Sequence, residues 1–156
     1  MTENNKALLS RVFGEVLEQM AFMFADAVDA DEPPLPPSSP LLAHMTFRGA
    51  MAGRLSLAVT ADMCPEIAAN LLGTEPEEAA DPKVSRDALK ELLNVTCGHV
   101  LTALAGDQPV FDLTVPQVEE LDEELWTAMA AAPETAAMLV DDHPVLLSIE
   151  LDEKGA

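Results

Sequence analysis

Three polar side chains and one glycine are spaced so that they share one side of a predicted helix. Asp87, Glu91, Asn94 and Gly98 follow one another at steps of four, three and four residues, which places them in one row on a helix surface. The carboxylate of Glu91 can pair with a cation of a partner, and the amide of Asn94 can hold a water molecule through its oxygen and its NH₂ group. An amide is not a base, so this row predicts docking on a partner and orientation of a water rather than proton abstraction.

A solvated helix face is the simpler interpretation of the same row, because exposed Asp, Glu and Asn residues are common in any protein. Two details favour a functional surface. Asn94 is an unfavourable residue for the middle of a helix. Gly98 costs about 1 kcal/mol in a helix interior relative to alanine, and its bare backbone would let another chain approach closely.

The helix that carries the row is predicted over residues 85–106. Ser85 is expected to cap its start and Gly106 to end it. The residues opposite the row recur at helical spacing and are mostly apolar, so they are expected to face a core. They are Leu89, Leu92, Leu93, Thr96, Val100, Ala103 and Leu104.

The same residues carry a resemblance to a known family. Asp87, Glu91 and Asn94, followed by Gly98 and by Pro116, resemble the phosphatase motif of the CheC/CheX/FliY family. That motif has Asp or Ser, three residues, Glu, two residues and Asn, with a proline about two dozen residues later. Residues 95–115 separate Asn94 from Pro116 here, about one fewer than the family spacing. A single copy of the motif in a chain of this length is most similar to CheX.

The resemblance implies a function and a role for each residue of the row. The family hydrolyses the aspartyl phosphate of phosphorylated CheY-type response regulators in chemotaxis signalling. By this resemblance Glu91 and Asn94 are the catalytic residues: Glu91 pairs with the active-site lysine of the receiver domain, and Asn94 positions the attacking water. Asp87 and Gly98 are expected to bind the partner. The receiver supplies the Mg²⁺ ion, so no cofactor or metal site is expected in this chain, and a homodimer formed through the sheets is implied.

Composition limits the other function classes. The chain has 156 residues and a formal net charge of −20, which argues against nucleic acids and anionic membranes as partners. No long apolar run or leader-like segment is present in the sequence, so one cytoplasmic domain over residues 1–156 is expected. Cys64 and Cys97 are expected to be free thiols.

The rest of the chain predicts an α+β fold. We expect a two-layer sandwich, in which a mainly antiparallel sheet packs against a long N-terminal helix and two further helices, as in CheC-like proteins. The elements are expected in this order: a helix at 2–29, a proline-rich exposed loop at 29–40, two strands within 41–60 around a turn at 49–53, a helix at 62–72, an acidic loop at 74–83, the helix at 85–106, an extended segment at 110–115, helical turns at 125–132, and a strand pair at 134–140 and 145–151.

Two further interpretations of the row stay open at this point. The row could dock on a receiver domain without catalysis and sequester it, or it could be the solvated face of an acidic structural subunit. Asp141, Asp142 and His143 are expected to form a turn rather than a metal site. His44, at the apolar start of a strand, is expected to be structural.

Overall fold

The computed structural model describes residues 5–28 and 32–152 of the chain. Within these residues seven strands form one antiparallel sheet in the order β1-β6-β7-β3-β2, with β4 and β5 both pairing with β2 at the far edge. The strands are β1 (Ala25–Ala27), β2 (Pro40–Arg48), β3 (Ala52–Thr60), β4 (Asp112–Leu113), β5 (Gln117–Glu120), β6 (Thr135–Val140) and β7 (His143–Leu151).

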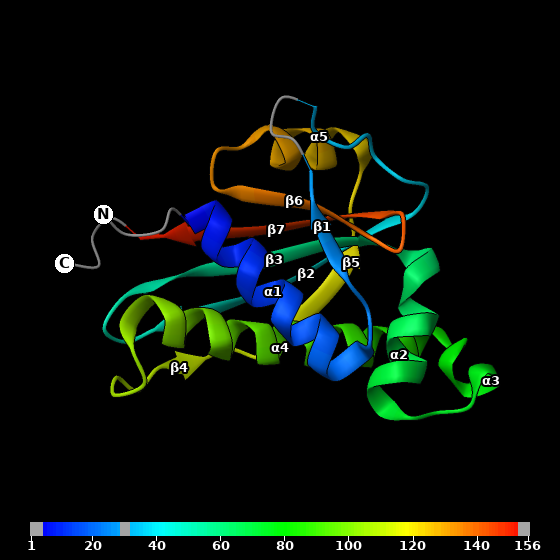
Figure 1. Cartoon of the computed structure of the whole chain (residues 1–156), viewed down its shortest axis with the longest axis horizontal. Coiled ribbons are helices and arrows are strands. Elements are labelled where there is room, and N and C mark those ends of the chain that lie inside the picture. Colours follow the sequence, from blue (N-terminus) through cyan, green and yellow to red (C-terminus); the bar gives the residue numbers. More distant parts are fainter. Residues whose placement is uncertain (1–4, 29–31, 153–156) are drawn as a thin grey trace.

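The helices lie on both faces of this sheet. They are α1 (Asn5–Ala21), α2 (Cys64–Leu72), which follows the 3₁₀ turn Ala61–Met63, then α3 (Pro76–Ala79), α4 (Pro82–Ala105) and α5 (Glu123–Ala131). In Figure 1, α1 crosses the sheet and α4 runs along its lower side, whereas α5 lies above β6. We call the sheet face under α1 and α4 the inner face and the opposite one the outer face.

The main core lies between the inner face and the helices α1, α2 and α4. Alternation along the strands sends Leu57 of β3 and Leu147 of β7 into this core, where both are fully buried. Leu9 and Leu17 of α1 are also fully buried against the same cluster. The predicted α+β class, with an antiparallel sheet against a long N-terminal helix and further helices, is confirmed.

A smaller core lies on the outer face under α5. Trp126 of α5 is fully buried there against Leu121, Ala58 of β3 and Leu146 of β7. Residues 123–131 therefore add a partial third layer to the two that the sequence predicted.

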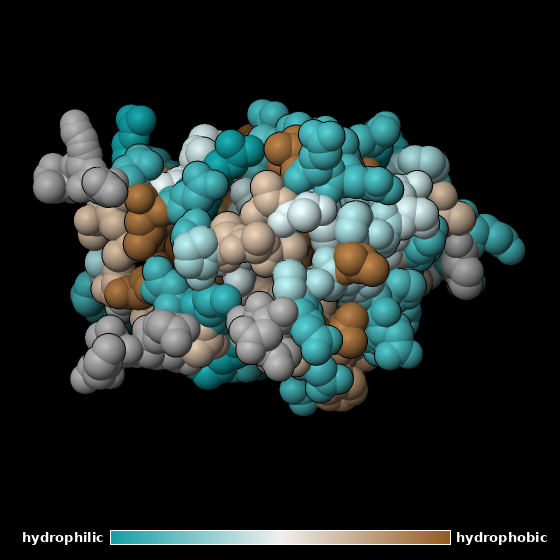
Figure 2. Space-filling model, turned by 90° about the horizontal axis from the view of Figure 1, so that it is seen from above, coloured by the Kyte–Doolittle hydropathy of each residue, from teal (hydrophilic) through white to brown (hydrophobic). Residues whose placement is uncertain are grey.

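Figure 2 shows the molecule from above relative to Figure 1. This side is mainly hydrophilic, with separate hydrophobic patches.

The N-terminal helix is shorter than predicted. It ends at Ala21 instead of near residue 29, because Phe22 takes a left-handed conformation with φ of 55°. The chain then turns into β1, a strand that the sequence analysis missed, which pairs with β6. Phe22 and Phe24, which lie within the predicted helix, follow the observed one and are exposed. The end of the predicted helix, at residue 29, lies outside the described residues.

The proline-rich loop is tied to the domain by hydrogen bonds from Thr60, Ala61 and Trp126. Its described part, residues 32–39, contains no helix or strand, as predicted. The indole Nε1 of Trp126 donates a hydrogen bond to the carbonyl of Pro34 at 3.0 Å. The loop therefore packs against α5, far along the chain.

The hairpins were predicted well. β2 pairs with β3 from Pro40–Thr60 to Arg48–Ala52, and β6 pairs with β7 around Asp141 and Asp142, whose φ values of 50° and 69° are those of a tight hairpin turn. The acidic strand β5 was not predicted. Its residues are mostly exposed at the sheet edge, so their burial pattern gives no strand signal.

No helix in the described ranges is both long enough and apolar enough to cross a membrane.

The burial of α4 generates the first prediction. Leu92 is fully buried in the main core, so Leu92→Asp should lower the free energy of unfolding by at least about 4 kcal/mol or prevent folding, because it adds a carboxylate and removes apolar contacts. Urea unfolding followed by circular dichroism measures this loss. Thr102→Asp places the same residue at an exposed position of α4 and should fold normally; equal stability of the two variants would contradict the assigned core face.

Candidate active site

The row of polar residues lies on the solvent side of α4. Asp87, Glu91, Asn94 and Gly98 are all exposed, as predicted. Behind them, five of the seven residues predicted to face the core are buried, and Leu104 packs against it. The exception is Ala103, which is exposed. The fixed core face thus points the row outward.

The start of α4 differs from the prediction. The N-cap is Asp81, whose side chain accepts a hydrogen bond from the backbone N–H of Lys83 at 2.9 Å, and Pro82 occupies the first turn. Ser85 lies inside the helix and is buried, and its hydroxyl donates to the carbonyls of Ala79 and Asp81. An Asp–Pro pair is a stronger start signal than an isolated serine. Gly106 ends the helix as predicted, with a φ of 84°.

An open hollow of about 460 Å³ brings most of the motif together. One wall is α4, with Asp87, Glu91 and Asn94, and the other is the segment 113–116, which ends in Pro116. Lys90, half-buried on α4, completes the lining on the helix side. The helix motif and the distant proline therefore face the same space.

The second wall is held by the edge of the sheet. The backbone N–H of Thr114 donates to the carbonyl of Thr46 at 3.0 Å, and the N–H of Thr46 donates to the hydroxyl of Thr114 at 2.8 Å. Just before this segment, the ring of Phe111 packs edge-on against Phe47, with centroids 6.2 Å apart. A Cβ on Gly49 would lie 2.7 Å from the carbonyl oxygen of Val110, so this glycine permits the close approach of the segment.

The wall carries exposed apolar surface. Val115 is 77% exposed and Leu113 is 40% exposed. Both line the hollow beside the polar row. Apolar side chains around a polar centre are typical of surfaces that bind another protein.

Positive charge is concentrated along the first turns of α4. Lys83, Arg86 and Lys90 lie there, although the whole chain has only 8 Lys and Arg residues against 28 Asp and Glu. Lys83 forms an ion pair with Asp87 at 3.3 Å, and both side chains are exposed. An exposed pair at this spacing contributes little stability, but it holds one charge of the row in place.

Gly98 does not line this hollow. It lies one turn further along α4, in a neighbouring hollow that shares Leu113 with the first. An added Cβ on Gly98 would meet no atom within 4 Å. No packing within the described residues requires a glycine there, so its bare surface is open to a partner.

Several residues of the hollow were not predicted from the sequence. Lys90 was not assigned a role, although it stands one turn before Asn94 on the same helix. Leu113, Thr114 and Val115 were expected only as an extended run, and nothing in their local sequence indicates that they face α4. The spacing to Pro116 in the family motif is the one signal that pointed to this segment.

Cysteine and metal chemistry are not features of the described site. Cys97 and Cys64 are buried free thiols, as predicted, and burial raises the pKa of each to about 11. They are therefore protonated near neutral pH and poor nucleophiles. Within residues 5–28 and 32–152, no group of three or more His, Cys, Asp or Glu side chains is arranged to hold a metal ion. His44 is half-buried and bonds the carboxylate of Glu119 at 2.8 Å, in line with a structural role.

Comparisons with known proteins point to one family. A family model described as chemotaxis phosphatase CheX matches residues 41–136, more than half of the chain. A search of curated protein sequences gives no match. The matched range includes the whole of α4 and the segment that ends in Pro116.

Solved structures share the fold over nearly the full chain. Chemotaxis protein CheX from Vibrio vulnificus has a TM-score of 0.69 at 15% identity, with 96% of this chain and 97% of that chain covered. CheX from Desulfovibrio desulfuricans has a TM-score of 0.66 at 15% identity, with 95% and 99% covered. A CheX–CheY–BeF₃–Mg²⁺ complex from Borrelia burgdorferi gives 0.63 at 17% identity, with 94% and 97% covered.

Proposed function

The chain belongs to the CheX family of chemotaxis phosphatases, and on this premise we propose that it hydrolyses the aspartyl phosphate of a phosphorylated CheY-type response regulator. The observation that carries the proposal is the shared hollow: Glu91 and Asn94 of α4 face the segment that ends in Pro116. The motif is thus assembled in space as well as in sequence. One of the similar structures is a complex of CheX with CheY, which supports a receiver domain as the partner.

The proposed reaction needs little chemistry from this chain. An aspartyl phosphate is an activated acyl phosphate, and the receiver is proposed to supply Mg²⁺ and a lysine. The remaining requirement is a water in line with the phosphorus–oxygen bond that breaks. Positioning of this kind accounts for much of the rate acceleration in phosphoryl transfer.

Asn94 is proposed to hold that water. Its amide is exposed on α4 and lies at the rim of the hollow, so it can reach into a partner without rearrangement of the core. The amide oxygen can accept a hydrogen bond from the water, and the NH₂ group can donate to it or to a phosphoryl oxygen. Its role is orientation, since an amide does not take up a proton.

Glu91 is proposed to fix the register of Asn94. It stands one turn earlier on the same side of α4 and is exposed, so a lysine of the receiver can pair with its carboxylate. A pair that becomes buried in the complex gains strength because the surrounding water is displaced. This local attraction is needed because a net charge of −20 repels an acidic partner.

The neighbours of this pair are proposed to form the rim of the interface. Asp87 is already paired with Lys83, which suits a rim residue, and Gly98 offers open backbone beside it. Leu113 and Val115 would supply apolar contact, and Lys90 would offset the negative charge of the phosphoryl group. Such an arrangement has a polar centre with apolar contacts around it.

We further propose that residues 1–156 form a single domain that acts in the cytoplasm as a homodimer. In this chain the edge strand β1 lies next to Phe22 and Phe24, which are 73% and 63% exposed. An unpaired strand edge with exposed aromatic rings favours pairing with a second copy. Sedimentation equilibrium should give twice the monomer mass; a monomer at micromolar concentration would contradict the dimer.

Asn94→Ala should abolish most of the phosphatase activity and leave the fold unchanged. We expect a loss of about 100-fold or more in the rate of phosphate release, because the water is no longer oriented. Alanine is a better helix former than asparagine, so unfolding is not expected. The measurement is phosphate release from a phosphorylated CheY-type receiver. Gln19→Ala removes an exposed amide from α1 and should keep full activity; full activity of Asn94→Ala would contradict the role.

Glu91→Ala should weaken association as well as turnover. Loss of one partner of an ion pair that is buried in the complex costs about 2 kcal/mol or more, which corresponds to roughly 30-fold weaker binding. Titration calorimetry with a BeF₃-treated receiver measures the affinity. Glu18→Ala makes the same charge change at an exposed position of α1 and should bind normally. Unchanged affinity and turnover in Glu91→Ala would rule out the lysine contact.

The two assays together separate catalysis from sequestration. A receiver that binds through Glu91 but loses phosphate no faster with the protein than without it would identify a binding module that lacks phosphatase activity.

A further inference from the structure

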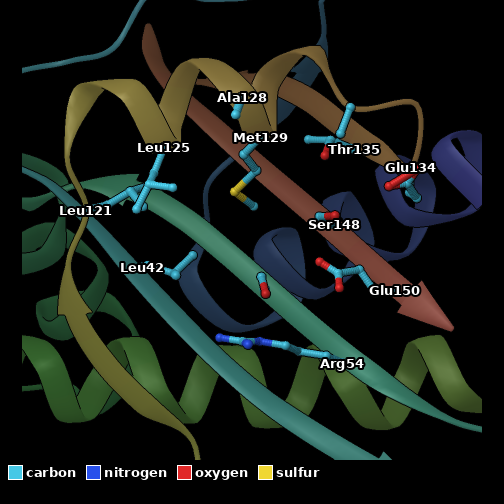
Figure 3. Close-up of a pocket in the computed structure, with 12 residues that line it drawn as sticks. Leu42, Arg54, Leu121, Leu125, Ala128, Met129, Glu134, Thr135, Ser148 and Glu150 are labelled. Atoms are coloured by element: carbon cyan, nitrogen blue, oxygen red, sulfur yellow. The ribbon is translucent and has the colours of Figure 1, made fainter. Parts of the chain in front are cut away.

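Another hollow, unrelated to the motif, lies on the outer face between α5 and the sheet. Its volume is about 360 Å³, and it is open to solvent on the side that α5 leaves uncovered. Figure 3 shows α5 above it, with Met129 pointing down toward the sheet, and Arg54 below. None of the residues proposed for phosphatase activity lines it.

The register of the strands gives this hollow a gradient of polarity. Under α5, Leu146, Ala58 and Leu42 lie side by side on β7, β3 and β2. Two residues along the strands, Ser148 and Ser56 are paired in the same way.

Two residues further still, Glu150 of β7 faces Arg54 of β3. Alternation along the strands puts all three rows on the outer face. The hollow therefore runs from an apolar end to a charged end.

Two polar atoms in this hollow have no partner in the described part of the chain. The hydroxyl of Thr135, a residue that is only 2% exposed, and the Nε of Arg54 are both buried without a hydrogen bond. Arg54 also forms no ion pair with Glu150 within the described residues, although the two are cross-strand neighbours. Buried polar groups are normally satisfied, so two such atoms in one hollow indicate a place where a ligand can bind.

We propose that this hollow binds a small α-amino acid with an apolar side chain. The guanidinium of Arg54 matches a carboxylate. The carboxylates of Glu150 and Glu134, which lie toward the same end in Figure 3, match an ammonium group. The apolar end, with Leu42 and Leu121, takes the side chain.

The charges and the size favour this class over others. A simple anion would meet Arg54 but also two carboxylates, and a simple cation would meet the carboxylates but also Arg54. A zwitterionic head group satisfies both signs at once. The volume lies at the lower end of the range of about 300 to 1,000 Å³ that is typical of small-molecule sites, which suits a ligand of amino-acid size.

The test is direct binding, read from the single tryptophan. Trp126 is fully buried on α5 beside the hollow, so its fluorescence should change saturably with L-leucine, L-methionine or L-phenylalanine. Titration calorimetry gives the affinity. For L-leucine, two analogues test the head group: 4-methylpentanoate lacks the ammonium and 3-methylbutylamine lacks the carboxylate. Each should bind at least about tenfold more weakly, because one charged contact is lost.

Variants assign the binding to this hollow. Arg54→Gln and Glu150→Gln should each weaken amino-acid binding by at least about tenfold. Arg48→Gln removes an exposed arginine from β2, on the same sheet but outside the hollow, and should bind normally. Because Glu150 is exposed, its variant is expected to fold even if Arg54→Gln does not, and thermal unfolding checks each.

Three results would overturn the proposal. The first is the absence of saturable binding for all three amino acids. The second is equal binding of L-leucine and 4-methylpentanoate, or undiminished binding to Glu150→Gln. The third is a change of sedimentation behaviour in Arg54→Gln without any amino-acid binding to the wild type, which would make this face a contact between two copies of the chain.

Discussion

The burial of one side of α4 is the constraint on which the proposed site depends. Leu89, Leu92 and Leu93 are fully buried against the sheet and the neighbouring helices, and burial of each such side chain stabilises the fold by about 1.5–3 kcal/mol. A helix fixed on one side has no rotational freedom about its own axis. The opposite residues, Glu91 and Asn94, must then face solvent in a set orientation. The proposed catalytic groups therefore need no hydrogen bonds of their own to be presented to a partner.

A second constraint supplies the other wall, and it is non-local. The segment that ends in Pro116 is fixed by paired hydrogen bonds between Thr114 and Thr46 and by contact of Phe111 with Phe47. These contacts join the segment that follows α4 to β2, a strand that precedes α4 by about forty residues in the chain. The hollow thus depends on sheet pairing as well as on helix packing, and a change at the edge of β2 would alter the site without touching the motif.

The difference between local sequence patterns and contacts between distant segments explains which features could be predicted from the sequence. The periodicity of α4 and the alternation in β3 are local patterns, and α4, β2 and β3 were all predicted at nearly their observed positions. The end of α1 depends on the left-handed Phe22, a conformation that no local pattern favours for phenylalanine. The strand β5 is exposed at a sheet edge, and Thr114 gains its role only from pairing with Thr46. The motif residues were therefore predictable, whereas the surface that faces them was not.

The charge distribution shows why the row on α4 and the facing wall must act together in binding a partner. A chain with a net charge of −20 gains nothing from long-range attraction to an acidic receiver, and charges further than about 8 Å apart are screened at physiological ionic strength. Binding must then rest on short-range contacts. The row on α4 has them in combination: a carboxylate for a basic group, Lys83, Arg86 and Lys90 on the same turns, and exposed apolar residues on the facing wall. A site built this way would select its partner by local fit, because the overall field opposes every acidic protein equally.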